Sequence, residues 1–166
     1  AKKAALAAGQ ILIEQKNNLN KSIFSSNTDI KLEADLVAEE LIKDLLIDGT
    51  SFPILAEESG QSSDQLTNIF WVVDPLDGTA NYSRNIPICC VSIALIKNMK
   101  PVLGVIYDFS NNDLYEGSVN TSAMQNGLEI KVSDISNQGE GILITGLPNK
   151  TDYSDEALLK MIKDFQ

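Results

Sequence analysis

The sequence predicts an α+β protein, with two N-terminal helices packed on a mostly antiparallel sheet and the start of a second α/β half. Two observations lead to this fold class. Apolar residues recur at helical spacing over residues 2–18 and 34–48. After residue 69, short apolar runs alternate with turn residues such as Asn126-Gly127, a pattern typical of hairpins.

The elements before the hairpins are predicted in order. Residues 2–18 form the first helix, and residues 34–48 form the second, which ends at Asp48-Gly49 because glycine commonly stops a helix. A short strand is expected over 52–56. A polar segment follows at 57–68, and a second strand is expected over 69–73.

The sheet continues as hairpins. Residues 89–97 and 101–108 read as two strands joined by a short connection, and residues 114–119 and 128–133 read as further strands. We therefore assign residues 1–140 to an N-terminal α+β domain.

Residues 141–166 are assigned to the beginning of a truncated C-terminal α/β half. Residues 141–146 are apolar enough for a buried strand, and residues 155–165 have the spacing of an amphipathic helix.

Composition excludes several classes of function. The chain has 166 residues and a net charge of -10, without the Lys and Arg clusters that nucleic-acid partners select. Apolar runs are too short for a membrane span, and no secretory signal is recognisable. Cys89 and Cys90 lie in an apolar stretch, which favours two buried thiols in a reducing compartment over a redox pair. We expect a cytoplasmic protein without nucleic-acid or membrane partners.

Residue types that are missing narrow the chemistry further. The sequence contains no histidine, which removes Ser-His-Asp catalysis and His-based zinc sites. Arg84 is the sole arginine, whereas Asp and Glu number 23. The chemistry left open is that of carboxylates and hard, oxygen-binding cations.

Two aspartates directly follow the predicted strand 69–73. Asp74 and Asp77 are three positions apart, and Pro75 is expected to interrupt the hydrogen-bond ladder and turn the backbone between them. Such a turn brings both carboxyls, and the carbonyl of Leu76, toward one point. Charges beside a buried strand are costly unless a positive partner is present, and the candidates are a basic side chain, a helix N-terminus or a metal ion.

The next residues suit an anion. Gly78 and Thr79 are expected to open a short helix whose free amides face a phosphate group, so that cation and phosphate meet at one place. An ordinary turn with Asp at both ends is the simpler alternative. The D-x-D-G-T motif of haloacid dehalogenases places its aspartates two apart, and the spacing of three argues against that aspartyl-phosphate chemistry.

A third acid ends the other short strand. If strand 52–56 lies beside strand 69–73, then Glu57 arrives next to Asp74, and a cation between them would relieve their repulsion. An acidic loop start in solvent is the alternative for Glu57 alone. By its spacing, Asp35 reads as a residue that caps or flanks the second helix.

The segment WVVDPLDGTANYSR at 71–84 resembles the first signature of the inositol monophosphatase family. LAEES at 55–59 resembles the upstream Glu-Glu-Ser of that family, and DIKLEADLVAEELI at 29–42 is similar to its aspartate-bearing helix. The family order continues through VSIAL at 91–95, GVIYD at 104–108 and NGLEIKVS at 126–133. This resemblance implies the N-terminal part of the layered sugar-phosphatase fold.

The resemblance also implies an activity and its residues. It implies a magnesium-dependent, lithium-sensitive phosphomonoesterase that uses two or three Mg²⁺ ions and forms a homodimer. By this resemblance the metal ligands are Glu57, Asp74, the Leu76 carbonyl and Asp77. Gly78 and Thr79 correspond to the phosphate-binding amides, while Asp35 and Thr79 form a pair that activates water with Glu57.

The sequence departs from the family pattern in one respect that bears on the expected activity. Family members carry a later Trp-Asp-x-Ala motif that supplies another metal ligand, whereas Trp71 is the only tryptophan here. We therefore expect weak or absent activity from these residues alone. The alternatives are a catalytically silent cation-binding remnant, or an intact protein with 3'(2'),5'-bisphosphate nucleotidase, fructose-1,6-bisphosphatase or histidinol-phosphatase activity.

Overall fold

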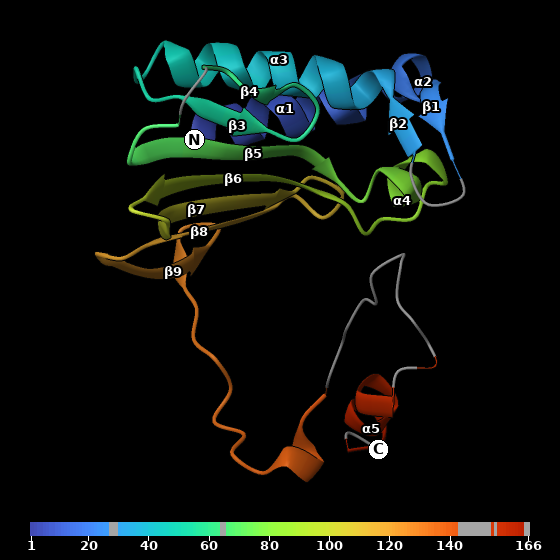
Figure 1. Cartoon of the computed structure of the whole chain (residues 1–166), viewed down its shortest axis with the longest axis vertical. Coiled ribbons are helices and arrows are strands. Elements are labelled where there is room, and N and C mark those ends of the chain that lie inside the picture. Colours follow the sequence, from blue (N-terminus) through green and yellow to red (C-terminus); the bar gives the residue numbers. More distant parts are fainter. Residues whose placement is uncertain (27–29, 64–65, 143–153, 155, 165–166) are drawn as a thin grey trace. The chain divides into compact units, whose positions relative to one another are not determined.

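The structure is a computed structural model that describes residues 1–166 except 27–29, 64–65, 143–153, 155 and 165–166. It divides into two compact units, Ala1–Lys131 and Val132–Gln166. The first unit contains the large sheet and helices α1 to α4 (Figure 1). Its fold is α+β, as predicted.

The two predicted N-terminal helices are present with one difference. The second is α3 (Glu33–Ile47), close to its predicted bounds. The first is divided at Gln15 into α1 (Lys2–Glu14) and the single turn α2 (Lys16–Leu19). The expectation of one unbroken helix over 2–18 is wrong at Gln15, whose backbone leaves the helical conformation with φ of -104° and ψ of 13°.

Within the described residues, eight strands form one sheet in the order β10-β9-β8-β7-β6-β5-β3-β4. All neighbours pair antiparallel except β3 and β5, which are parallel. A separate antiparallel ribbon pairs β1 (Ser22–Ser25) with β2 (Ile30–Leu32). The strands of the large sheet are β3 (Ile54–Ala56), β4 (Gly60–Gln61), β5 (Ile69–Asp77), β6 (Cys90–Lys97), β7 (Lys100–Asp108), β8 (Asp113–Ser118), β9 (Thr121–Gln125) and β10 (Leu128–Glu129).

The hairpins were predicted in the right order but not in full. Asn98 and Met99 both have positive φ in the β6–β7 turn, as do Asn126 and Gly127 in the β9–β10 turn. Strand β9 was not predicted, because its sequence TSAMQ lacks the apolar alternation of a half-buried strand. The expected strand over 128–133 is wrong beyond Glu129, since β10 has only two paired residues.

Strand β5 continues through the proline. The prediction that this strand ends at Val73 is wrong, because β5 reaches Asp77. The ladder is nevertheless interrupted at Pro75, as expected for a residue without an N–H. Asp74 pairs with Ser92 and Asp77 with Cys90, so three steps on β5 match two on β6. This irregularity is a β-bulge, which bends the strand where the acids lie.

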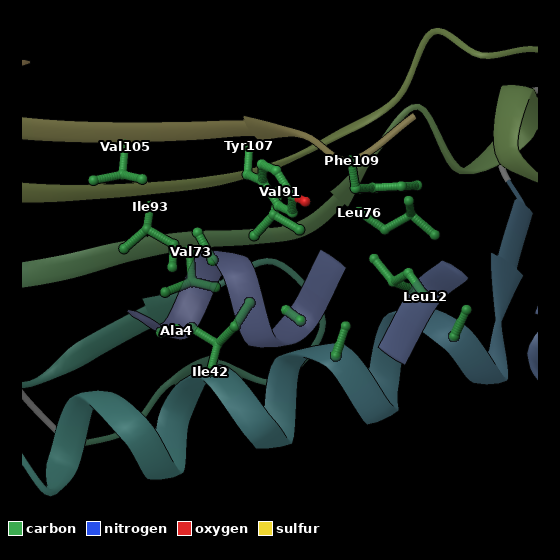
Figure 2. Packing of buried hydrophobic residues seen from close by; sticks show 14 of the residues in the cluster. Ala4, Leu12, Ile42, Val73, Leu76, Val91, Ile93, Val105, Tyr107 and Phe109 are labelled. Atoms are coloured by element: carbon green, nitrogen blue, oxygen red, sulfur yellow. The ribbon is translucent and has the colours of Figure 1, made fainter. Parts of the chain in front are cut away.

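Helices α1 and α3 cover one face of the sheet (Figure 1). Their apolar stripes meet the strands in one core, part of which is drawn in Figure 2, where Ile42 faces Val73 and Leu12 faces Leu76. Gly9 lets α1 approach β7 closely, because a Cβ there would meet the ring of Tyr107. Burial of these apolar side chains supplies the main free energy that holds the helices on the sheet.

The second unit contains the 3-10 turn η1 (Gln138–Glu140) and α5 (Glu156–Asp164). Helix α5 confirms the helix predicted over 155–165. The strand predicted over 141–146 lies mostly outside the described residues, and residues 141–142 have no regular structure. Among the helices of the described structure, none combines the length and apolarity that crossing a membrane requires.

Candidate active site

Parallel pairing of β3 and β5 brings Glu57 beside Asp74. Ala56 lies opposite Val73, and the Glu57 N–H donates to the Val73 carbonyl oxygen over 3.1 Å. Glu57 and Asp74 each come one residue later, and their carboxyls share a hydrogen bond. The expectation that these two acids are neighbours is confirmed.

Burial and repulsion raise the pKa values of both carboxyls. The pKa of Glu57 is raised to about 7, first by desolvation and then by the negative charge of Asp74. The pKa of Asp74 is also raised, chiefly by desolvation. Two neighbouring carboxylates repel each other when both are ionised, so without a cation the pair favours a state that keeps one proton.

The bulge of β5 arranges the remaining oxygen atoms. The Leu76 N–H donates to Oδ1 of Asp74 over 3.2 Å, which fixes the aspartate against its own turn. Asp77 is exposed, and its charge contributes to the raised pKa of Asp74. The thiol of Cys90 lies 3.9 Å from Oδ2 of Asp77. Asp77 therefore faces solvent at the edge of the pair formed by Glu57 and Asp74.

Gly78 makes the transition from strand to helix. Its φ of +90° lies in the left-handed region that favours glycine, and a Cβ there would lie 2.6 Å from the Ile88 carbonyl oxygen. Helix α4 (Thr79–Ser83) begins at the next residue, so the predicted short helix is confirmed. Tyr82, fully buried in α4, donates its hydroxyl to the Leu12 carbonyl of α1 over 2.7 Å and so anchors α4.

Asp35 connects α3 to the start of α4. Its Oδ2 accepts the Leu32 N–H over 2.6 Å, and its Oδ1 lies 2.9 Å from the hydroxyl of Thr79. The same hydroxyl lies 3.0 Å from the Leu76 carbonyl. Burial raises the pKa of Asp35 to about 6, although both hydrogen bonds favour the ionised form. Asp35 therefore caps α3 and also contacts Thr79.

The oxygen atoms at this place are of the kind that magnesium prefers as ligands. Within the described ranges, no three Cys, Asp or Glu side chains form a cluster that could hold a metal by themselves. Magnesium seldom needs one, because it is usually bound by one or two carboxylates and completes its octahedron with water or phosphate oxygens. Glu57 and Asp74 are such a pair, with the Leu76 carbonyl and Asp77 on the same bulge.

The family of this chain can be decided by comparison with known proteins. The sequence profile of the inositol monophosphatase family matches residues 1–163. The chain belongs to this family. Its fold is similar to that of a solved structure, the inositol monophosphatase from Anabaena, with a TM-score of 0.71 and 37% sequence identity. That alignment covers 83% of this chain and 50% of the other.

Two curated relatives of the inositol monophosphatase family match along nearly the whole chain. The Nus factor SuhB of Xylella fastidiosa is 36% identical over 163 residues, which are 96% of this chain and 58% of that protein. The fructose-1,6-bisphosphatase/inositol-1-monophosphatase of Aquifex aeolicus is 34% identical over 173 residues, covering 99% of this chain and 63% of that protein. The chain spans less than two thirds of the length of these relatives.

Sequence reasoning missed one buried acid of this inositol monophosphatase family member. Asp35 and Glu39 are 2% and 3% exposed, and they are the two fully buried charged residues of the described structure. Glu39 stands one turn after Asp35, between the buried residues Ala38 and Ile42. A carboxylate on the apolar stripe of a helix was the available signal, since such a group is seldom buried unless it is paired.

Proposed function

We propose that the intact protein hydrolyses a small phosphomonoester, of the inositol-monophosphate or sugar-phosphate kind, with Mg²⁺ as its cofactor. The observation that carries this proposal is the pairing of Glu57 with Asp74, two partly buried carboxyls whose pKa values are both raised. A divalent cation between them would remove the repulsion that the metal-free pair relieves with a proton.

The proposed metal ligands come from two short stretches of chain, the end of β3 and the bulge of β5. Glu57 supplies a carboxylate from the end of β3, and the bulge of β5 supplies the carboxylates of Asp74 and Asp77 with the carbonyl of Leu76. Bound Mg²⁺ lowers the pKa of coordinated water and neutralises charge on the phosphoryl oxygens. In phosphoryl transfer the protein contributes mainly by positioning the reacting groups and by stabilising the negative charge of the transition state.

The attacking water and the phosphate group would be held by further side chains and by backbone amides of the site. When the Thr79 hydroxyl donates its proton to Asp35, an oxygen lone pair of Thr79 is left to accept a hydrogen bond from the attacking water. The carboxylate of Glu57 is the group of the proposed site that would accept the proton of that water. The backbone amides of Gly78 and Thr79 at the start of α4 would hold the phosphate.

Metal binding and phosphate release, measured on the same samples, test this proposal. Calorimetry with Mg²⁺ should show binding to the wild-type chain and its loss in Asp74→Asn, which keeps the shape but removes the charge. Asp44→Asn is the matched control, because Asp44 is exposed on α3. Absence of Mg²⁺ binding by the wild type would overturn the proposal.

The substrate class is tested by phosphate release from inositol 1-phosphate, fructose 1,6-bisphosphate and a 3'-phosphonucleotide. We expect inositol 1-phosphate to be preferred by the intact protein, with inhibition by Li⁺. The name of the Aquifex relative makes fructose 1,6-bisphosphate the second substrate to compare. Binding of Mg²⁺ without release of phosphate would identify a silent cation-binding protein. Light scattering of the same samples tests the proposed homodimer.

A further inference from the structure

Helix α3 carries two buried carboxylates one turn apart, and only Asp35 contacts the candidate active site directly. We propose that Glu39 is a positioning residue, which holds the turn after Glu57 so that the Glu57 carboxylate is aimed at Asp74 and at the cation. This inference rests on the proposed function, because it assumes that Glu57 is a cation ligand.

The contacts of Glu39 lead to this role. Its Oε2 accepts the backbone N–H of Glu58 over 2.9 Å, and its Oε1 lies 3.6 Å from Nζ of Lys43. The same ammonium group of Lys43 donates to Oγ of Ser59 over 3.0 Å. Side chains of α3 thus hold both residues that follow Glu57.

These contacts fix the Glu57 backbone from two sides. The N–H of Glu57 is bound to the Val73 carbonyl oxygen of β5, which orients the peptide group before this residue. The N–H of Glu58 belongs to the peptide group after it, and Glu39 orients that group. With both peptide planes fixed, the direction of the Cα–Cβ bond of Glu57 is determined by the fold.

The Glu58 side chain is held separately. Its Oε2 forms an ion pair of 2.6 Å with Nζ of Lys31, and the Glu58 side chain is only 5% exposed. The turn therefore cannot swing outward without breaking an ion pair and a charge-assisted hydrogen bond together. A cation ligand on such a turn is preorganised, as ligands supported by hydrogen-bonded neighbours generally are.

The chemical identity of Glu39 argues against a purely structural role. It lies among apolar residues of α3, where a leucine would pack without the cost of burying a charge. Replacing a buried ion pair as a whole by apolar residues is often neutral or stabilising, whereas removing one partner alone is destabilising. A carboxylate at this position is therefore explained by its two partners, the Glu58 N–H and the ammonium group of Lys43.

Calorimetry with Mg²⁺ on three variants of the chain tests the proposal. Glu39→Leu should weaken Mg²⁺ binding by about tenfold to a hundredfold, the usual effect of losing a supporting group. Glu39→Gln should recover most of the affinity, because its amide oxygen still accepts the Glu58 N–H. Glu40→Leu is the control, since it makes the same change one residue later on the exposed face of α3.

The outcomes separate this inference from the proposed function. If the wild type binds no Mg²⁺, the proposed function fails and the role of Glu39 fails with it. If the wild type binds Mg²⁺ and a folded Glu39→Leu binds it equally well, only the role of Glu39 is overturned. A Gln variant as weak as the Leu variant would overturn it too.

Amide exchange of the wild-type chain keeps the inference testable even if Glu39→Leu does not fold. The Glu58 amide should exchange at least tenfold more slowly than an unprotected amide in the metal-free protein, because Glu39 holds it before any cation binds. Exchange at the unprotected rate, with protection appearing only after Mg²⁺ is added, would overturn the positioning role.

Discussion

The hydroxyl of Thr79 lies 2.9 Å from Oδ1 of Asp35, and this contact joins the first turn of α3 to the start of α4 across 44 residues of sequence. Asp35 is almost fully buried and has a pKa raised to about 6 by desolvation. Loss of the Thr79 donor therefore leaves a buried carboxyl with one hydrogen bond fewer, which has a measurable cost.

Thr79→Val should lower the free energy of unfolding by about 1–3 kcal/mol, because it removes the hydroxyl and leaves an oxygen of Asp35 unsatisfied. Urea unfolding followed by the fluorescence of Trp71 measures this change. Thr79→Ser retains the hydroxyl and should remain near the wild type. Equal stabilities of Thr79→Val and Thr79→Ser would show that the contact contributes nothing to folding.

Gly78→Ala should destabilise the chain more than Gly60→Ala does. Both glycines have positive φ, so both substitutions carry the backbone cost of about 1–2 kcal/mol. Only at Gly78 does the new Cβ meet a backbone atom, the Ile88 carbonyl oxygen at 2.6 Å, which adds about 1–3 kcal/mol of crowding. Thermal unfolding compares the two variants, and a larger loss for Gly60→Ala contradicts the geometry of this turn.

Gly9→Ala tests the packing of α1 on the sheet. An exposed helix gains up to about 1 kcal/mol from such a change, whereas here the Cβ would meet the ring of Tyr107 and lie 2.9 Å from Cβ of Phe109. We expect a net loss of about 1–3 kcal/mol in urea unfolding. Gly49→Ala, whose Cβ has no neighbour closer than 3.7 Å, should change stability little. A gain in stability for Gly9→Ala would place α1 farther from β7.

The stability of the metal-free protein should fall as pH rises through the range from about 4.5 to 7. The folded-state pKa of Glu57 is raised from 4.5 to about 7, so in this range the folded chain binds more protons than the unfolded chain. Stability decreases with pH wherever the folded state holds more protons. Asp35, raised from 3.8 to about 6, acts in the same direction.

Urea unfolding at a series of pH values, with a chelator present, measures this dependence. Glu57→Gln should flatten the part between pH 6 and 7, because it removes the group with the higher raised pKa. Added Mg²⁺ should restore stability at pH 7 to the wild type and not to Glu57→Gln. A metal-free wild type that becomes more stable over this range would contradict the carboxyl pair.

The elements that could be predicted from the sequence are those whose apolar residues recur at a regular spacing. The apolar stripes of α1 and α3 lie at helical spacing, and both helices pack on the sheet. The adjacency of Glu57 and Asp74 was also accessible, because each acid directly follows a short apolar run in the sequence. Local pattern is informative where burial alone decides which residues face the core.

The parts that sequence reasoning missed depend on tertiary contacts. Strand β5 crosses Pro75 because pairing with β6 resumes at Asp77 after a bulge, and no local signal reports that partner. Strand β9 has little apolar pattern of its own and pairs with β8. The role of Glu39 depends on an N–H nineteen residues away, which becomes visible only when α3 lies beside the turn after β3.

The most direct test of the central claim is anomalous diffraction from crystals of this chain soaked in Mn²⁺, which stands in for Mg²⁺. The account predicts a manganese peak between the carboxyls of Glu57 and Asp74, and its loss in Asp74→Asn. A peak elsewhere, or no peak in crystals where these two carboxyls still lie in contact, would contradict the assignment of this pair as the cation site.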